Sequence, residues 1–246
     1  MDNRIILKKI TFIALLEIMM IILMFAIMFF LKVFGIQGGI ISRLIPFLSI
    51  LICLSFSFFA IDKNRLNWRI NNQNILISLL FFVIAIIPAV FDQCFLQNLM
   101  GGNINFGWLG YYSLVAVAEE LFFRAYIRFK LHSLNKKYWI IISATAFSAI
   151  HFISSEQLSI TFFLLIFLYG VIFAITYEMI DSILPLIVFH MVWNFMADNS
   201  ENYSNMLIVF GIWTVMILVS IVIRYAKKQY KRSRPPLPKS NGGSCA

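Results

Sequence analysis

The chain has 246 residues, of which 61% are hydrophobic and only 13% are charged, and its mean hydropathy is +0.87. Soluble domains are about 45–50% apolar, so this composition excludes an ordinary water-soluble protein. The net charge of +9 does not indicate nucleic-acid binding, because the basic residues lie between apolar runs and in the tail, where anionic lipid headgroups are the expected partners.

Apolar runs of about 17–25 residues, the length at which a helix crosses a bilayer, predict an all-α bundle of about eight transmembrane helices rather than a barrel. In chain order, the expected spans are residues 10–34, 44–61, 75–91, 107–127, 139–153, 158–180, 183–197 and 206–225. The first run is too long for the apolar part of a signal peptide, and no small-residue cleavage site follows it. We therefore expect it to remain in place as an anchor.

Lysine and arginine predict the orientation, because these residues are retained on the cytoplasmic side. They gather in residues 4–9, 63–69 and 128–137 and in the tail, so an even number of spans places both termini in the cytoplasm. Residues 1–226 are expected to form one transmembrane domain, with the motif-bearing core at about residues 75–200. Residues 227–246 are basic and rich in proline and glycine, and we expect them to be a disordered tail.

The fourth span carries charged residues, and an ionisable side chain near the centre of a span costs at least about 2.5–3.5 kcal/mol, so each one needs an explanation. This span contains Glu119 and Glu120, followed by Arg124. Glu120 and Arg124 are four residues apart on one helix face, so the arginine is expected to pair with this carboxylate. Glu119 is turned by about 100° and is expected to point into the bundle, free for chemistry.

Two further spans carry polar residues at a spacing of four. The fifth ends in Phe147-Ser148-Ala149-Ile150-His151, and the seventh contains His190-Met191-Val192-Trp193-Asn194. His190 and Asn194 share a helix face and are expected to project toward one point. A rise of about 1.5 Å per residue places Glu119, His151 and His190 in the cytoplasmic half of the bilayer, with His151 deepest.

These three motifs, in this order on successive helices, resemble those of the CPBP family, which includes the CAAX proteases and bacteriocin-processing enzymes and is also called the Abi family. The matching positions are Glu119, Glu120, Arg124, His151, His190 and Asn194. Each motif alone is weak, whereas the ordered set on membrane helices is specific. The resemblance implies an intramembrane endopeptidase with a glutamate-dependent mechanism.

On this resemblance, Glu119 is the general base that activates a water, and His151 helps to position that water. His190 and Asn194 donate hydrogen bonds to the developing oxyanion, and one such donor is worth about 2.7–4 kcal/mol. Glu120 and Arg124 form a structural pair. No cofactor is required on this mechanism.

A metal-dependent mechanism is the alternative. Glu119, His151 and His190 are the residues that would bind Zn²⁺, with one carboxylate left as the base. The spacing is not that of a zinc protease helix with His-Glu-x-x-His, and asparagine is a poor zinc ligand. The sequence therefore favours the metal-free mechanism and keeps zinc as a possible cofactor.

Other functions also use buried polar residues. A lone histidine or asparagine often forms a hydrogen bond between helices, which contributes about 0.6 kcal/mol of stability. Two adjacent carboxylates with an arginine and two histidines instead favour a functional site. A bacteriocin immunity protein that binds without catalysis is one rival, and an ion or proton carrier is another. Glu17 is expected to pack or to face a wet groove, and Glu178 and Asp181 are expected to be solvated.

Short loops and the lack of an organelle signal favour the bacterial cytoplasmic membrane as the location. The expected partners are a peptide or protein substrate at the membrane and anionic lipids at the basic loops and tail. We expect cleavage near the C-terminal part of the substrate. A bacteriocin or pheromone precursor is favoured over a prenylated protein.

Overall fold

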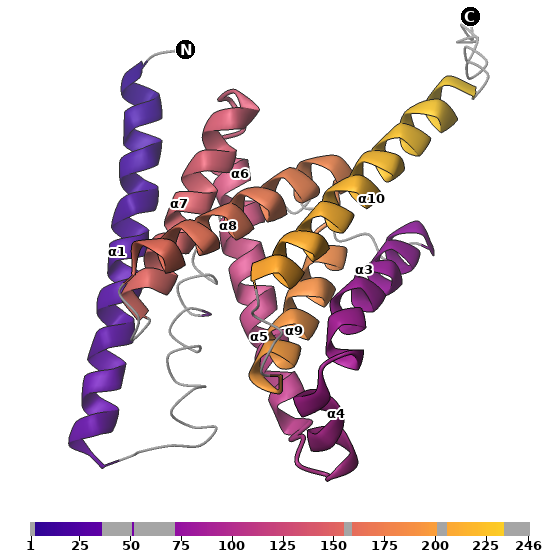
Figure 1. The fold of residues 1–246 in the computed structure, drawn as a ribbon. Helices are drawn as coiled ribbons and strands as arrows, with labels where there is room; N and C mark the ends of the chain where they lie inside the picture. The colour runs from indigo at the N-terminus through magenta and orange to yellow at the C-terminus, as the bar shows by residue number, and fades with distance from the viewer. Residues whose placement is uncertain (1–2, 36–50, 52–71, 155–158, 201–205, 234–246) are drawn as a thin grey trace, which may run out of the picture.

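The structure is a computed structural model that describes residues 3–35, 51, 72–154, 159–200 and 206–233. In this part of the chain every regular element is a helix, which confirms the expected all-α class (Figure 1). The helices are α1 (Asn3–Val33), α3 (Asn72–Val90), α4 (Gln93–Met100), α5 (Gly107–Glu119), the π-helix η2 (Glu120–Tyr126), α6 (Ile127–Lys130), α7 (Lys136–Ser154), α8 (Ile160–Ile180), α9 (Leu184–Asp198) and α10 (Met206–Ser233).

The predicted spans in the described residues coincide with these helices. The fourth span is a run of three consecutive elements, α5, η2 and α6, and the other spans each match one helix. The predicted span 44–61 lies outside the described residues, apart from position 51. The expected number of spans therefore stays a prediction for the whole chain.

Two elements differ from the prediction. Helix α4 is too short to cross a bilayer and begins where the side chain of Asp92 accepts a hydrogen bond of 2.8 Å from the backbone N–H of Phe95, a typical N-cap. Helix α10 runs to Ser233, although disorder was expected from Lys227 onward. Lysine and arginine are good helix formers, so the helix continues beyond its apolar part. Residues 234–246 lie outside the described residues.

Several helices suit a membrane by length and composition. In the described residues, four are long and apolar enough to cross one, and they include Leu7–Val33 and Ile208–Tyr230. Their outer faces expose large apolar side chains, such as Phe29 at 65% and Val222 at 66%. Apolar surface on this scale is costly in water and favourable in lipid. The protein is therefore a membrane protein.

Close helix packing holds the centre of the bundle together. At Gly170 of α8, an added Cβ would lie 2.9 Å from the Cα of Ala144 on α7, so only glycine allows this approach. Helix α3 packs on α9, where the rings of Phe81 and Phe189 meet edge to face with centroids 6.1 Å apart. Helix α5 packs on the same α9. These contacts bring α5 beside α9 and hold α7 against α8.

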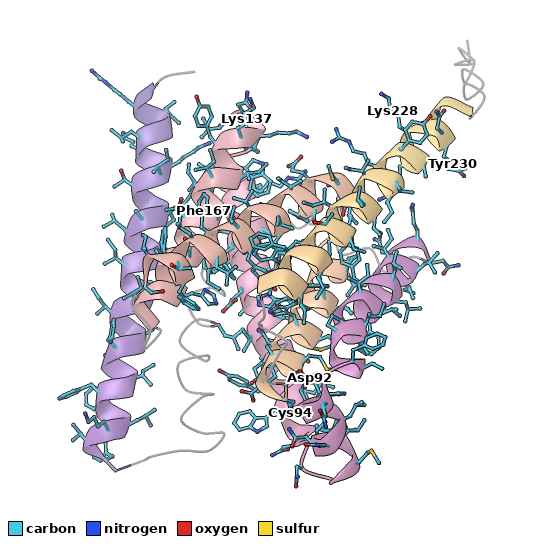
Figure 2. All side chains as sticks on the ribbon, in the orientation of Figure 1. Asp92, Cys94, Lys137, Phe167, Lys228 and Tyr230 are labelled. Atoms are coloured by element: carbon cyan, nitrogen blue, oxygen red, sulfur yellow. The ribbon has the colours of Figure 1, made fainter. Side chains whose placement is uncertain are left out.

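The two ends of the bundle differ in charge. The first turn of α1 and the last turn of α10 lie at the same end, and Lys137 and Lys228 are at this end while Asp92 and Cys94 are at the other (Figures 1 and 2). This arrangement agrees with the predicted sorting of basic residues to one side. Which end faces the cytoplasm stays a prediction.

Ion pairs join the helix ends at the basic side, and here a prediction was wrong. Glu178 was expected to be solvated, but its carboxylate lies 2.7 Å from Nε of Arg128 and 2.6 Å from Nζ of Lys136. Asp181 lies 3.2 Å from Nη1 of the same arginine. The sequence did not show these pairs, because they join residues on three different helices.

Candidate active site

The two adjacent glutamates lie where α5 changes into a π-helix. Glu119 is the last residue of α5, and Glu120 is the first of η2. Glu120–Tyr126 are all buried. A π-helical turn inside an α-helix is rare and is often found at functional sites. The sequence predicted a plain α-helix here, so the wider turn is a finding of the structure.

Glu120 and Arg124 form the expected pair inside the protein. Nε of Arg124 lies 3.3 Å from Oε2 of Glu120, and both side chains are fully buried. The two atoms are close enough for an ion pair but are not aligned for a hydrogen bond. The guanidinium also lies 4.4 Å from the ring centre of Phe147 and 5.3 Å from that of Phe173. Aromatic faces therefore supply much of the contact to this cation.

His190 joins the two carboxylates. Its Nδ1 lies 2.9 Å from Oε1 of Glu120, and its Nε2 lies 3.5 Å from Oε2 of Glu119. The side chain is only 2% exposed. Because Glu120 is paired with Arg124 and is an acceptor, Nδ1 of His190 is assigned as the donor. Glu120 therefore orients a histidine as well as pairing with the arginine, and the sequence predicted only the second contact.

His151 faces the same carboxylate from α7. Its Nε2 lies 3.8 Å from Oε2 of Glu119. Its Nδ1 lies 2.8 Å from the carbonyl oxygen of Phe147, and since a carbonyl only accepts, Nδ1 donates. In its neutral form the ring presents the lone pair of Nε2 toward Glu119. The side chain is 28% exposed, so His151 is the most accessible of the residues around Glu119.

The structure brings most of the predicted site residues together. Glu119, Glu120, Arg124, His151 and His190 form one connected cluster through the contacts above. Asn194 lies one helical turn beyond His190 and is half-buried. In the described residues, no hydrogen bond links its amide to the cluster. Its role as an oxyanion donor remains an expectation.

Sequence reasoning missed the aromatic wall of this cluster. The ring of His190 lies edge-on to Phe147, Tyr169 and Phe173, with centroids 6.2, 6.0 and 5.6 Å away. The chain has 26 phenylalanines, so composition alone does not mark these positions. The spacing of four between Phe147 and His151 was the one feature of the sequence that could have placed an aromatic ring beside this cluster.

The structure gives no positive support to the alternative with a bound metal, which stays a prediction. In the part of the chain that the structure describes, no three His, Cys, Asp or Glu side chains are arranged as a metal site requires. The hydrogen bond from Nδ1 of His190 goes to a second carboxylate, and both Nε2 atoms approach a single carboxylate oxygen. We therefore derive no step through a metal ion.

A cavity of about 380 Å³ lies elsewhere, between α3 and α10. Its lining includes Ile84, Pro88, Asp92 and Gly211 and none of the six predicted site residues. The lining is mostly apolar, and it brings no acid and base together. The candidate active site is therefore defined by its chemistry and not by this cavity.

The fold and the cluster define a helical membrane protein with acid and imidazole groups buried among its helices. Residues 101–196 match the family model described as type II CAAX prenyl endopeptidase Rce1-like. The matched segment contains Glu119, Glu120, Arg124, His151, His190 and Asn194, the positions that carry the resemblance seen in the motifs, and so supports that resemblance. No curated protein sequence matches the chain.

Proposed function

We propose that the protein is an intramembrane endopeptidase in which Glu119 activates a water molecule. The observation that carries this proposal is the convergence of His151 and His190, from two other helices, on Oε2 of Glu119. The distances of 3.8 and 3.5 Å exceed those of direct hydrogen bonds, which are about 2.7–3.2 Å. Polar groups at such separations are commonly bridged by water.

In the proposed reaction, Glu119 takes a proton from the water while Nε2 of His151 accepts a hydrogen bond from it. The resulting hydroxide attacks the carbonyl carbon of the scissile peptide bond. In this reaction His190 donates from Nδ1 to Glu120 and from Nε2 to the oxyanion, with Asn194 as the second donor. The proton on Glu119 then passes to the departing amine, and the carboxylate is regenerated.

The proposed substrate is a membrane-associated peptide or protein, cut near its C-terminal part. The family description names a CAAX prenyl endopeptidase, whereas the short loops favour a bacterial cytoplasmic membrane and, by analogy, a bacteriocin or pheromone precursor. We favour the second source. Anionic lipids at the basic end of the bundle are the proposed second partner.

Replacing Glu119 by glutamine tests the proposal. Purified protein is mixed with candidate precursor peptides and with a prenylated peptide, with and without chelator, and the products are identified by mass spectrometry. We expect Glu119→Gln to lower the rate by about 10²–10⁴-fold, the usual contribution of a general base. Chelator should leave the wild-type rate unchanged.

Glu17→Gln is the matched control, because it makes the same change in α1, where Oε1 of Glu17 is buried and has no hydrogen-bond partner among the described residues. It should cleave at the wild-type rate. Equal activity of wild type and Glu119→Gln would contradict the glutamate mechanism. Protection of cells that survives Glu119→Gln would favour the immunity protein, and proton or ion flux in liposomes without cleavage would favour the carrier.

A further inference from the structure

We infer that Phe147 is a positioning residue that holds His151 in the orientation needed for catalysis and joins it to the buried ion pair of Glu120 and Arg124. This inference rests on the proposed function and deepens it. Phe147 is the first residue of the second motif, and neither the motif's implied mechanism nor the proposed reaction gives it a role.

Phe147 contacts His151 in two ways. The two rings lie with their centroids 4.3 Å apart at an angle of 39°. The backbone carbonyl of Phe147 accepts the hydrogen bond from Nδ1 of His151 at 2.8 Å. Residues four apart on a helix are neighbours on one face, so one residue can supply both contacts. The carbonyl selects the protonated nitrogen, and the ring limits rotation of the imidazole.

The same ring also contacts the buried cation. The guanidinium carbon of Arg124 lies 4.4 Å from the ring centre of Phe147, the shortest of its three aromatic contacts. Arg124 is held in turn by Glu120, and Glu120 bonds to His190. A continuous path of contacts therefore runs from His190 through Glu120, Arg124 and Phe147 to His151.

The ring of Phe147 is itself fixed in place. It is 1% exposed, meets Phe123 edge to face at 5.2 Å and stacks on Tyr169 at 5.9 Å. Side chains packed this tightly occupy one rotamer. His151, in contrast, is 28% exposed on its side chain. A rigid ring therefore supports the one histidine of the cluster that is partly open.

The test compares Phe147→Leu, Phe147→Tyr and Phe81→Leu in the purified full-length protein. Phe81 is also fully buried, and among the described residues its ring packs against Phe189 and not against a histidine. We expect Phe147→Leu to lower kcat by about 10²-fold with little change in KM, since a misplacement of about 1 Å costs this much. Phe147→Tyr keeps the ring and should recover most of the rate.

The rates are compared per folded molecule, measured from the monodisperse peak in detergent. Phe81→Leu should keep the wild-type kcat. The inference is overturned if folded Phe147→Leu has the wild-type kcat, or if Phe81→Leu loses as much. The first result would leave the proposed function intact, because the wild type would still cleave.

An NMR measurement keeps the inference testable if the wild type cleaves no peptide, in which case the proposed function itself fails. Imidazole ¹⁵N signals report which nitrogen carries the proton, and His151→Gln identifies the signals of His151. We expect one tautomer, protonated at Nδ1, in the wild type and Phe147→Tyr. In Phe147→Leu the carbonyl remains, but the imidazole is free to rotate away from it, so we expect a mixture. An unchanged spectrum in Phe147→Leu would then overturn the inference.

Discussion

Glu119 and Glu120 are chemically identical neighbours with different surroundings. Glu120 is fully enclosed and contacts both Arg124 and His190. Glu119 keeps 7% of its surface exposed and faces two imidazoles at longer distances. A carboxylate held by a cation and a short hydrogen bond suits a structural role, and one with looser contacts suits a reacting role.

Glu120→Gln should destabilise the protein. The change leaves the guanidinium of Arg124 buried without a counter-charge, and breaking such a pair costs about 3–5 kcal/mol. Thermal unfolding in detergent measures the loss. Glu119→Gln, which makes the same change one residue earlier, should leave the unfolding temperature near that of the wild type.

Removal of the arginine as well should reverse most of this loss. In Glu120→Gln with Arg124→Met neither position of the pair carries a charge, and replacing both members of a buried pair is often nearly neutral. If the double variant were as unstable as Glu120→Gln, the charge of Arg124 would not be the cause.

At the scale of elements, the π-helix separates the roles of the two glutamates. Hydrogen bonds from residue i to i+5 widen the turn compared with an α-helix. Glu119 still belongs to α5 and Glu120 to the wider turn, and both contact the ring of His190 from opposite sides. The contact of α5 with α9 supplies the histidine to both carboxylates.

Gly170→Ala should loosen the contact of α7 with α8. The new Cβ would lie 2.9 Å from a backbone atom of Ala144, so one helix has to move. Overpacking of this kind costs about 1–3 kcal/mol, and because α7 carries His151, the rate of cleavage should fall too. Unfolding temperature and rate are measured together.

Gly110→Ala is the control for this prediction. An added Cβ at Gly110 of α5 meets nothing within 4 Å, and alanine favours a helix over glycine by up to about 1 kcal/mol. This variant should be as stable as the wild type or more so. A loss of stability equal to that of Gly170→Ala would show that the room for an added Cβ and the helix propensity of alanine do not determine the stability of these variants.

At the scale of the whole molecule, ion pairs tie together three helix ends at the basic side. Arg128 of α6 and Lys136 of α7 both bind Glu178 of α8. The carboxylate of Glu178 is only 9% exposed, whereas that of Asp181 is 63% exposed. Buried charge pairs are screened less by water and salt than exposed ones.

Glu178→Gln should therefore destabilise the protein more than Asp181→Asn. Loss of hydrogen bonds to charged partners costs about 1.5–3 kcal/mol each, while an exposed pair contributes up to about 1 kcal/mol. Asparagine also tolerates the left-handed backbone of Asp181, which has φ of 55°. Thermal unfolding at low salt measures the loss of stability in each variant. Equal losses in the two variants would contradict the expectation that the more buried carboxylate contributes more.

The orientation of the molecule is testable with reporters. A fluorescent protein fused after Ala246 should fluoresce, because we expect the basic end to face the cytoplasm. A phosphatase that is active only outside the cytoplasm should be active when inserted at Gly102, in the connection between α4 and α5. The reverse pattern would invert the predicted orientation.

Much of the fold could be predicted from the sequence, because a bilayer imposes simple rules on length and polarity. Apolar runs of spanning length marked the helices now seen as α1, α3 and α7 to α10. The pairing of Glu120 with Arg124 followed from a spacing of four. Helix α4 was missed because it is short, and the π-helix because its hydrogen bonds leave no sign in hydropathy.

The sequence by itself determined the helical class and the identity of the polar groups that the membrane core must accommodate, since each carries a solvation cost that depends on residue type alone. Only the tertiary structure decided which of these groups meet. His190 lies 70 residues from Glu120 in the chain and bonds to it through the packing of α9 beside α5 and η2. The contacts of the Phe147 ring with Arg124 and His190 arose in the same way, because contacts between helices are set by packing and not by spacing within one helix.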